Sequence, residues 1–238
     1  MIRRRNLSGE RLELYSPIGL MPTDTFTGQA PLGRLQVMLD ILDGGQWRET
    51  GIKEVRTPGG VIAYPGLGRS LDVAPQFEHR YRVRIQAEFY VPLYIKTVDG
   101  TLDGIEFDGF PYNDTNPPKN YPINPAGFPN YLKAVLKKLW LVPAPNYPFP
   151  DHVPVLRGVV VRSGTGEPVI GAEVIWGNKE MALTTEKGAF GLPMRVTEKK
   201  HITDLQKIDA RDPRKNQQGT ISVIVPKDVG INKTITVS

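Results

Sequence analysis

The chain has 238 residues, no cysteine and a formal net charge of +5. The lack of cysteine excludes disulfides and thiolate metal sites, and no apolar run approaches the ~18 residues of a membrane-spanning helix. Hydrophobic residues make up 39% of the sequence, which is enough for a packed core. Glycine (24 residues) and proline (22 residues) are abundant, so we expect many short strands rather than long helices.

The N-terminal residues, MIRRRNLSGERLEL, are basic but have no apolar segment behind them, so they do not resemble a secretory signal. We therefore expect a protein that is assembled in the cytoplasm. Arg3, Arg4 and Arg5 are candidate docking charges for an acidic protein surface. Nucleic-acid binding is not expected, because no aromatic stacking positions accompany the basic residues.

Two stretches of the first half alternate apolar and polar residues with the period of a β-strand. In APLGRLQVMLD, we expect Leu35, Val37 and Leu39 to face inward. In HRYRVRIQAEFYVP, a slip of one residue would bury arginines, so the register is strongly specified. The inward set of this second stretch is Tyr81, Val83, Ile85 and Ala87, and the outward set is Arg82, Arg84, Gln86 and Glu88.

The last 85 or so residues read as five or more short strands that are separated by turns. The turn SGTGEP separates an apolar stretch, VLRGVVVR, from the next strand. Several short strands with this spacing favour an antiparallel sandwich. The residues expected to face its core are Val159 and Val161, then Val169, Ala172, Val174 and Trp176, then Ile221, Val223 and Val225, and finally Ile235 and Val237.

One phrase occurs twice in the chain, as VRTPGGVIAYPGLG and as LTTEKGAFGLPMRV. Each copy runs from threonine through a turn to glycine, an alternating stretch and proline. We expect positive φ or a close approach at both glycines, because a Cβ would be penalised there. Thr57, Gly60 and Pro65 of the first copy correspond to Thr185, Gly188 and Pro193 of the second.

The repeated phrase predicts a mainly β protein with two tandem antiparallel sandwiches. We place an N-terminal sandwich at 1–108, a connector rich in proline and aromatic residues at 109–153, and a second sandwich at 154–238. The stretch LRGVVVRSGTGEPVIGAEVIWGNKEMALTTEKGAFGLP resembles the carboxypeptidase regulatory-like module, a transthyretin-like (prealbumin-like, Ig-like) β-sandwich. The resemblance implies this fold but does not indicate an activity, since such modules are mostly accessory or adhesive parts of larger assemblies.

Eleven of the chain's 22 prolines lie between Pro111 and Pro154, and they favour extended arms over sheet. Within the connector, NYLKAVLKKLWL has helical spacing of its apolar residues and predicts one amphipathic helix at about 130–141. The helix and arms are expected either to pack on the protein's own core or to bind another subunit, and a peripheral membrane contact is a third alternative. The candidate interface residues are Tyr112, Tyr121, Phe128, Leu132, Leu136, Leu139, Trp140, Tyr147 and Phe149.

The sequence carries no recognisable catalytic pattern, and we expect no enzyme activity, cofactor or metal. Its three histidines, His79, His152 and His201, are widely spaced, and none belongs to a ligand pair. They are expected in exposed loops or at strand ends. The carboxylates of VDGTLDGIEFDG do not have the spacing of a calcium-binding EF-hand.

The order of the segments resembles small accessory proteins of phage-tail-like contractile injection systems, in particular cap or terminator-associated subunits. The features that carry the resemblance are GVIAYPGLGR and YRVRIQAEFYVPLY, then NDTNPP, then YPFPDHVPVLRGVVV. It implies a structural protein that self-associates into a ring by head-to-tail contacts of sandwich edges and connector arms, and that binds other subunits of the particle.

A carbohydrate- or surface-binding module is the alternative, because sandwiches of this kind often accompany enzymes or adhesins. Such a module needs a coplanar strip of exposed aromatic rings. Tyr90, Tyr94 and Tyr112 are the candidates for that strip.

Overall fold

The computed structural model describes residues 14–70, 79–94, 103–109, 111–113, 136–177, 180–195, 205–225 and 227–238. Within these residues the chain forms β-strands β1 to β16 and no helix. The strands belong to one large sheet and two small ones. The mainly β class expected from the composition is therefore confirmed.

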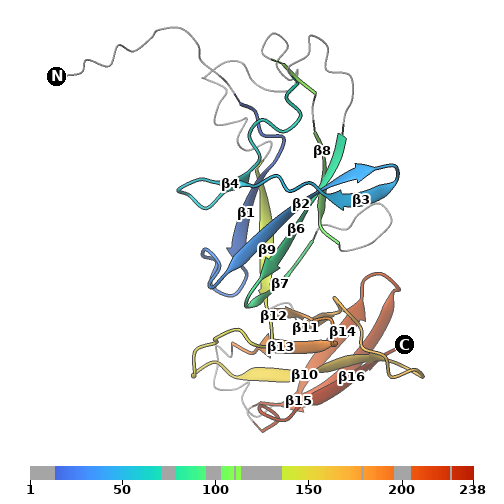
Figure 1. The fold of residues 1–238 in the computed structure, drawn as a ribbon. Helices are drawn as coiled ribbons and strands as arrows, with labels where there is room; N and C mark the ends of the chain where they lie inside the picture. The colour runs from blue at the N-terminus through green and yellow to red at the C-terminus, as the bar shows by residue number, and fades with distance from the viewer. Residues whose placement is uncertain are drawn as a thin grey trace, which may run out of the picture. The chain divides into compact units, whose positions relative to one another are not determined.

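The first nine strands form one connected sheet (Figure 1). Its order is β3-β2-β6-β7-β9-β1-β5-β4, and β8 pairs with β6. A separate first sandwich of two sheets is thus not confirmed. The strands are β1 (Gly19–Asp24), β2 (Leu35–Asp43), β3 (Gln46–Glu49), β4 (Val55–Arg56), β5 (Ile62–Ala63), β6 (His79–Ala87), β7 (Tyr90–Pro92), β8 (Ile105–Gly109) and β9 (Leu136–Pro143).

The inward faces of β2 and β6 follow the predicted alternation. Arg82, on the opposite face of β6, has a side chain that is only 13% exposed. It forms an ion pair of 2.9 Å with the buried carboxylate of Asp40, and its guanidinium lies 4.6 Å from the Trp47 ring centroid. A slip of one residue would separate this largely enclosed cation from its carboxylate partner, which favours the observed register. Val37, Leu39, Tyr81, Val83 and Ile85 are buried as expected, and Leu35 and Ala87 are half-buried.

Strand β9 corrects the prediction of a helix at about 130–141. Residues 136–141 belong to this strand, so the helix is wrong for them, and 130–135 lie outside the described residues. Leu139 and Leu141 are buried while Trp140 between them is 41% exposed, which is a period of two. A short apolar run fits both periods, and the ladder with β7 decides between them: Val91 pairs with Val142 and Pro92 with Leu141.

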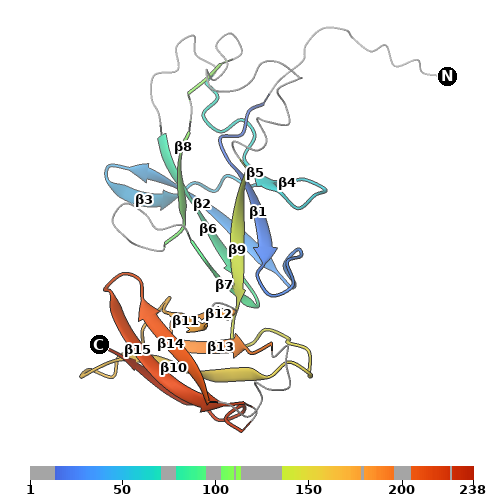
Figure 2. The same cartoon turned by 180° about the vertical axis from the view of Figure 1, so that it is seen from behind.

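The C-terminal part consists of a three-stranded sheet, β13-β10-β16, and a four-stranded sheet, β12-β11-β14-β15. Figure 2 shows the long β14–β15 hairpin of the second sheet from behind. Most of the neighbouring strands run antiparallel, but β10 and β16 pair in parallel. The strands are β10 (Val155–Arg162), β11 (Glu173–Trp176), β12 (Glu180–Leu183), β13 (Ala189–Pro193), β14 (Leu205–Asp212), β15 (Gln217–Ile224) and β16 (Lys233–Val237).

The two small sheets share one hydrophobic core, an arrangement that is compatible with a β-sandwich. The alternation predicted for β10 is wrong by one residue: Val160 is fully buried, whereas Val159 and Val161 are half-buried. Three successive valines leave the inward face ambiguous, and packing selects it. The other predicted core positions are confirmed, since Val169, Ala172, Val174, Trp176, Val223, Val225, Ile235 and Val237 are buried and Ile221 packs against them.

Both copies of the repeated phrase form the same turn. Gly60 N–H donates to the Thr57 carbonyl at 2.9 Å, and Gly188 N–H donates to the Thr185 carbonyl at 2.8 Å. The two glycines have φ values of +79° and +70°, as expected. The first turn joins β4 and β5 of one sheet, whereas the second joins β12 and β13 of different sheets. The repeat therefore encodes a turn, and it does not by itself encode a duplicated domain.

The chain divides into two compact units. One comprises Met1–Met21, Leu39–Arg82 and Glu106–Lys137, and the other Pro22–Met38, Val83–Ile105 and Lys138–Ser238. The boundaries predicted at 109 and 154 stay a prediction. No helix with the length and apolar character to cross a bilayer occurs in the described part of the chain.

Candidate functional site

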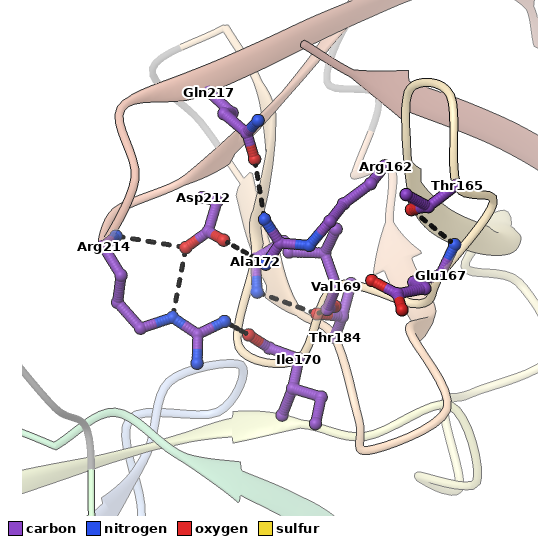
Figure 3. Close-up of polar contacts among 10 residues, drawn as sticks. All are labelled: Arg162, Thr165, Glu167, Val169, Ile170, Ala172, Thr184, Asp212, Arg214 and Gln217. Carbon is purple, nitrogen blue, oxygen red and sulfur yellow. Dashed lines mark hydrogen bonds and ion pairs between the residues drawn. The ribbon is translucent and has the colours of Figure 1, made fainter.

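A buried carboxylate at the end of β14 accepts several of the hydrogen bonds drawn in Figure 3. The side chain of Asp212 is 0% exposed. Arg162 Nη2 donates to its Oδ2 at 3.2 Å, and the Nε and backbone N–H of Arg214 each donate to Oδ1 at 3.1 Å. Arg162 also donates to Gln217 Oε1 at 2.9 Å. We call these four residues the Asp212 network.

The same region fixes the loop between β10 and β11. The hydroxyl of Thr184 donates to the Val169 carbonyl at 2.6 Å and accepts from the Ala172 N–H at 2.8 Å. Arg214 also donates to the Ile170 carbonyl, so the arginine ties this loop to the Asp212 network (Figure 3). Each donor in these contacts is paired with an acceptor of the protein, as is usual for buried polar groups. The network therefore holds strand ends and a loop together.

A second buried carboxylate, Asp24, lies at the end of β1 and is 0% exposed. Its Oδ1 accepts from the Phe26 N–H at 2.7 Å, which is the bond of an Asx turn. Its Oδ2 accepts from the hydroxyls of Tyr147 at 2.8 Å, Thr27 at 2.9 Å and Tyr90 at 3.2 Å. We call Asp24, Thr27, Tyr90 and Tyr147 the Asp24 cluster.

Burial shifts the pKa values of the two tyrosine hydroxyls in the Asp24 cluster. Burial, supported by the hydrogen bond to Asp24, raises the pKa of Tyr147 well above its ordinary value. Burial also raises the pKa of Tyr90. Both phenols therefore stay protonated near neutral pH, where they donate hydrogen bonds and do not act as bases. Tyr147 packs against Phe149, with ring centroids 4.7 Å apart.

Neither cluster has the arrangement of an active site. Each carboxylate uses both oxygens to accept bonds from neighbouring groups of the protein. Among the described residues, no three histidine, aspartate or glutamate side chains gather where they would hold a metal ion. His79 and His152 are exposed, as expected for a strand end and a loop, and His201 lies outside the described residues.

The predicted interface residues that the structure describes differ in their exposure. Tyr112, Leu139 and Tyr147 are buried within the chain, and Leu136 and Phe149 are half-buried. Trp140 is the exposed member of the set among the described residues. Tyr121, Phe128 and Leu132 lie outside the described residues, as do the candidate docking charges Arg3, Arg4 and Arg5.

The exposed aromatic strip expected for glycan binding is wrong. Tyr90 is 5% and Tyr112 1% exposed, so neither presents a ring face to solvent. Tyr94 is half-buried, and its hydroxyl is held by the backbone of Ile85, with both the donated and the accepted bond at 2.7 Å. The side of the sheet on which these aromatic rings lie is decided by packing, and Tyr90 and Tyr112 pack into the core.

Two central residues, Asp24 and Asp212, escaped the sequence analysis although each has a local signal. Asp24 stands in PTDTFTG and Asp212 in RDPRKN, and an aspartate at the start of such a polar stretch is typical of a turn. These stretches do not indicate that the aspartate side chains are buried. The burial of each aspartate depends on hydrogen-bond partners that are distant in sequence, 123 residues away for Asp24 and 50 residues away for Asp212.

No protein-family model, no curated protein and no solved structure matches this chain.

Proposed function

We propose that the protein is a non-enzymatic structural and assembly protein that binds neighbouring protein subunits. The observation that carries the proposal is Trp140, which is 41% exposed on a strand whose adjacent residues are buried. Tryptophan on a rigid element is a frequent anchor of protein interfaces, because it offers a large contact area at little entropic cost.

The backbone around Trp140 supports this role. Its carbonyl accepts from the Leu93 N–H at 2.9 Å, and Leu139 and Leu141 on either side are buried. Lys138 Nζ lies 5.5 Å from the centroid of the Trp140 ring and adds a positive charge beside it. A partner with an apolar pocket and an acidic rim fits such an aromatic and basic pair.

The narrower proposal is a cap or terminator-layer subunit of a phage-tail-like contractile injection system. Its support is the order of sequence segments that resembles those subunits. In such a layer, copies pack head to tail around a ring through sheet edges and the segments near β9. Other subunits of the particle are the further partners.

The test is co-expression of the chain with the proteins that its neighbouring genes encode, followed by mass photometry and electron microscopy. We expect rings or particle ends that are far larger than the 26.5 kDa monomer. Trp140→Ala is expected to dissociate them. Leu205→Ala is the matched control, because Leu205 is an exposed apolar residue on β14 with 66% exposure. A protein that stays monomeric with all its neighbours present contradicts the proposal.

A further inference from the structure

An open hollow of about 310 Å³ lies beside strands β2 and β6. It is lined by Arg34, Gln36, Gln86, Ala87 and Glu88. Its volume is at the lower end of the range for small-molecule sites, ~300–1,000 Å³. The hollow belongs to neither the Asp212 network nor the Asp24 cluster.

Three side chains that line the hollow have no polar partner among the described residues. Among the residues that the structure describes, the guanidinium of Arg34 and the carboxamides of Gln36 and Gln86 make no hydrogen bond or ion pair. A guanidinium carries five N–H donors, and each carboxamide carries two donors and one acceptor oxygen. Several uncommitted polar groups therefore border the hollow, beside the apolar parts of its lining residues.

The fourth polar side chain of the hollow is held in place. Glu88 Oε2 accepts from the Arg34 backbone N–H at 3.0 Å, and the Glu88 N–H donates to the Arg34 carbonyl at 3.0 Å. Asn146 Nδ2 donates to the Glu88 carbonyl at 3.0 Å. Gly33 has φ +72°, and a Cβ there would lie 2.9 Å from Glu88 Oε2, so glycine is needed for this corner. A ligand thus meets a carboxylate that is already positioned.

The combination of groups selects the chemistry of the ligand. An anion would be repelled by the Glu88 carboxylate, and a cation would be repelled by the Arg34 guanidinium. An apolar ligand would remove the polar groups from water without replacing their hydrogen bonds, which is costly. A neutral molecule with adjacent hydroxyl groups satisfies all of them, because each hydroxyl both donates and accepts.

We propose that this hollow binds a neutral saccharide unit. A carboxamide accepts from one hydroxyl and donates to its neighbour, so Gln36 and Gln86 each bind a vicinal pair. Arg34 donates to two sugar oxygens, and Glu88 accepts from a hydroxyl through its remaining oxygen. The binding is weak, in the millimolar range, because an open site buries only one face of the sugar. The proposal goes beyond the assembly role and does not depend on it.

The test is an NMR titration of the full ¹⁵N-labelled chain with glucose, galactose, mannose and N-acetylglucosamine, with glucuronate as a charged comparison. We expect at least one neutral sugar to shift the amide signals of 34–36 and 86–88. Replacing both glutamines (Gln36→Ala with Gln86→Ala) should weaken binding by roughly fivefold for each lost carboxamide. Gln218→Ala, at an exposed glutamine on β15, is the control and should leave binding unchanged.

Three results would overturn the proposal. They are no shift with any neutral sugar, shifts that persist unchanged in a folded double variant, and tighter binding of glucuronate than of every neutral sugar. The spectrum of each variant reports its fold directly, so loss of binding and loss of structure are distinguished. A negative result for saccharide binding does not bear on the proposed assembly role, which the Trp140 variant and the neighbouring gene products test separately.

Discussion

Tyr147 donates a hydrogen bond of 2.8 Å to Oδ2 of Asp24, a residue that precedes it by 123 positions. The bond secures the segment after β9 against the turn after β1. A buried carboxylate without donors would cost several kcal/mol, so each hydroxyl that reaches Asp24 stabilises the fold.

Tyr147→Phe is expected to lower the free energy of unfolding by ~1–3 kcal/mol, because it removes a donor from a buried carboxylate. Tyr64→Phe is the matched control. The Tyr64 hydroxyl is buried and has no hydrogen-bond partner among the described residues, so its removal should be neutral or stabilising. Urea unfolding of both variants measures the difference. Equal losses in the two variants would contradict the importance of the Asp24 cluster.

Asp212→Ala is expected to destabilise the protein by ~3–5 kcal/mol, because it leaves two arginines without their buried counter-ion. Asp209→Ala on the same strand should cost only ~0–1 kcal/mol, because its hydrogen bond from the Thr220 hydroxyl and its ion pair with Lys207 are both largely exposed. Denaturant midpoints and slopes from circular dichroism check both values. Similar midpoints for the two variants would show that the Asp212 network is dispensable.

The two glycines of the repeated turn should respond differently to alanine. Both have positive φ, which costs alanine ~1–2 kcal/mol. A Cβ at Gly60 meets no atom within 4 Å, whereas one at Gly188 would lie 2.7 Å from the Val160 carbonyl oxygen. Gly188→Ala should therefore cost ~1–3 kcal/mol more than Gly60→Ala in thermal or urea unfolding. The reverse order would show that the close packing at Gly188 relaxes without cost.

Asp228 should contribute to stability at neutral pH and lose that contribution in acid. The Ile224 N–H, first, and then Lys233 lower the pKa of Asp228 by bonding to its carboxylate, at 2.7 and 2.6 Å. Because the folded pKa is the lower one, the stabilisation is complete above the unfolded pKa, ~3.9, and disappears as the pH falls through the folded value. Asp228→Asn should flatten this part of a plot of Tm against pH. Parallel curves for variant and wild type would exclude the linkage.

Some features of the fold were predictable because they depend on neighbours in sequence. The alternation in β6 places Tyr81, Val83 and Ile85 inside, since a shift by one residue would bury arginines. The turn at Gly60 and Gly188 follows from a glycine that adopts positive φ. In both cases the preference acts within a few residues.

Other features could not be predicted from the sequence, because two local structures fit the same residues. LKKLWLVP satisfies the spacing of a helix and of a strand, and it becomes β9 because β7 offers a ladder of hydrogen bonds. The valines 159–161 fit either inward face of β10. The residues of the hollow beside β2 and β6 gave no signal at all, since exposed glutamine and arginine are ordinary on a strand.

The sequence by itself determined that this is a mainly β protein, which faces of its clear alternating strands are buried, and where glycine turns occur. The tertiary structure alone decided that the first nine strands form one sheet, that an apolar run becomes a strand, and that Asp24 and Asp212 are enclosed by distant donors. The physical reason is the range of the forces: torsional and turn preferences act between neighbours, whereas strand pairing and the burial of a charge require groups that only the folded chain brings together.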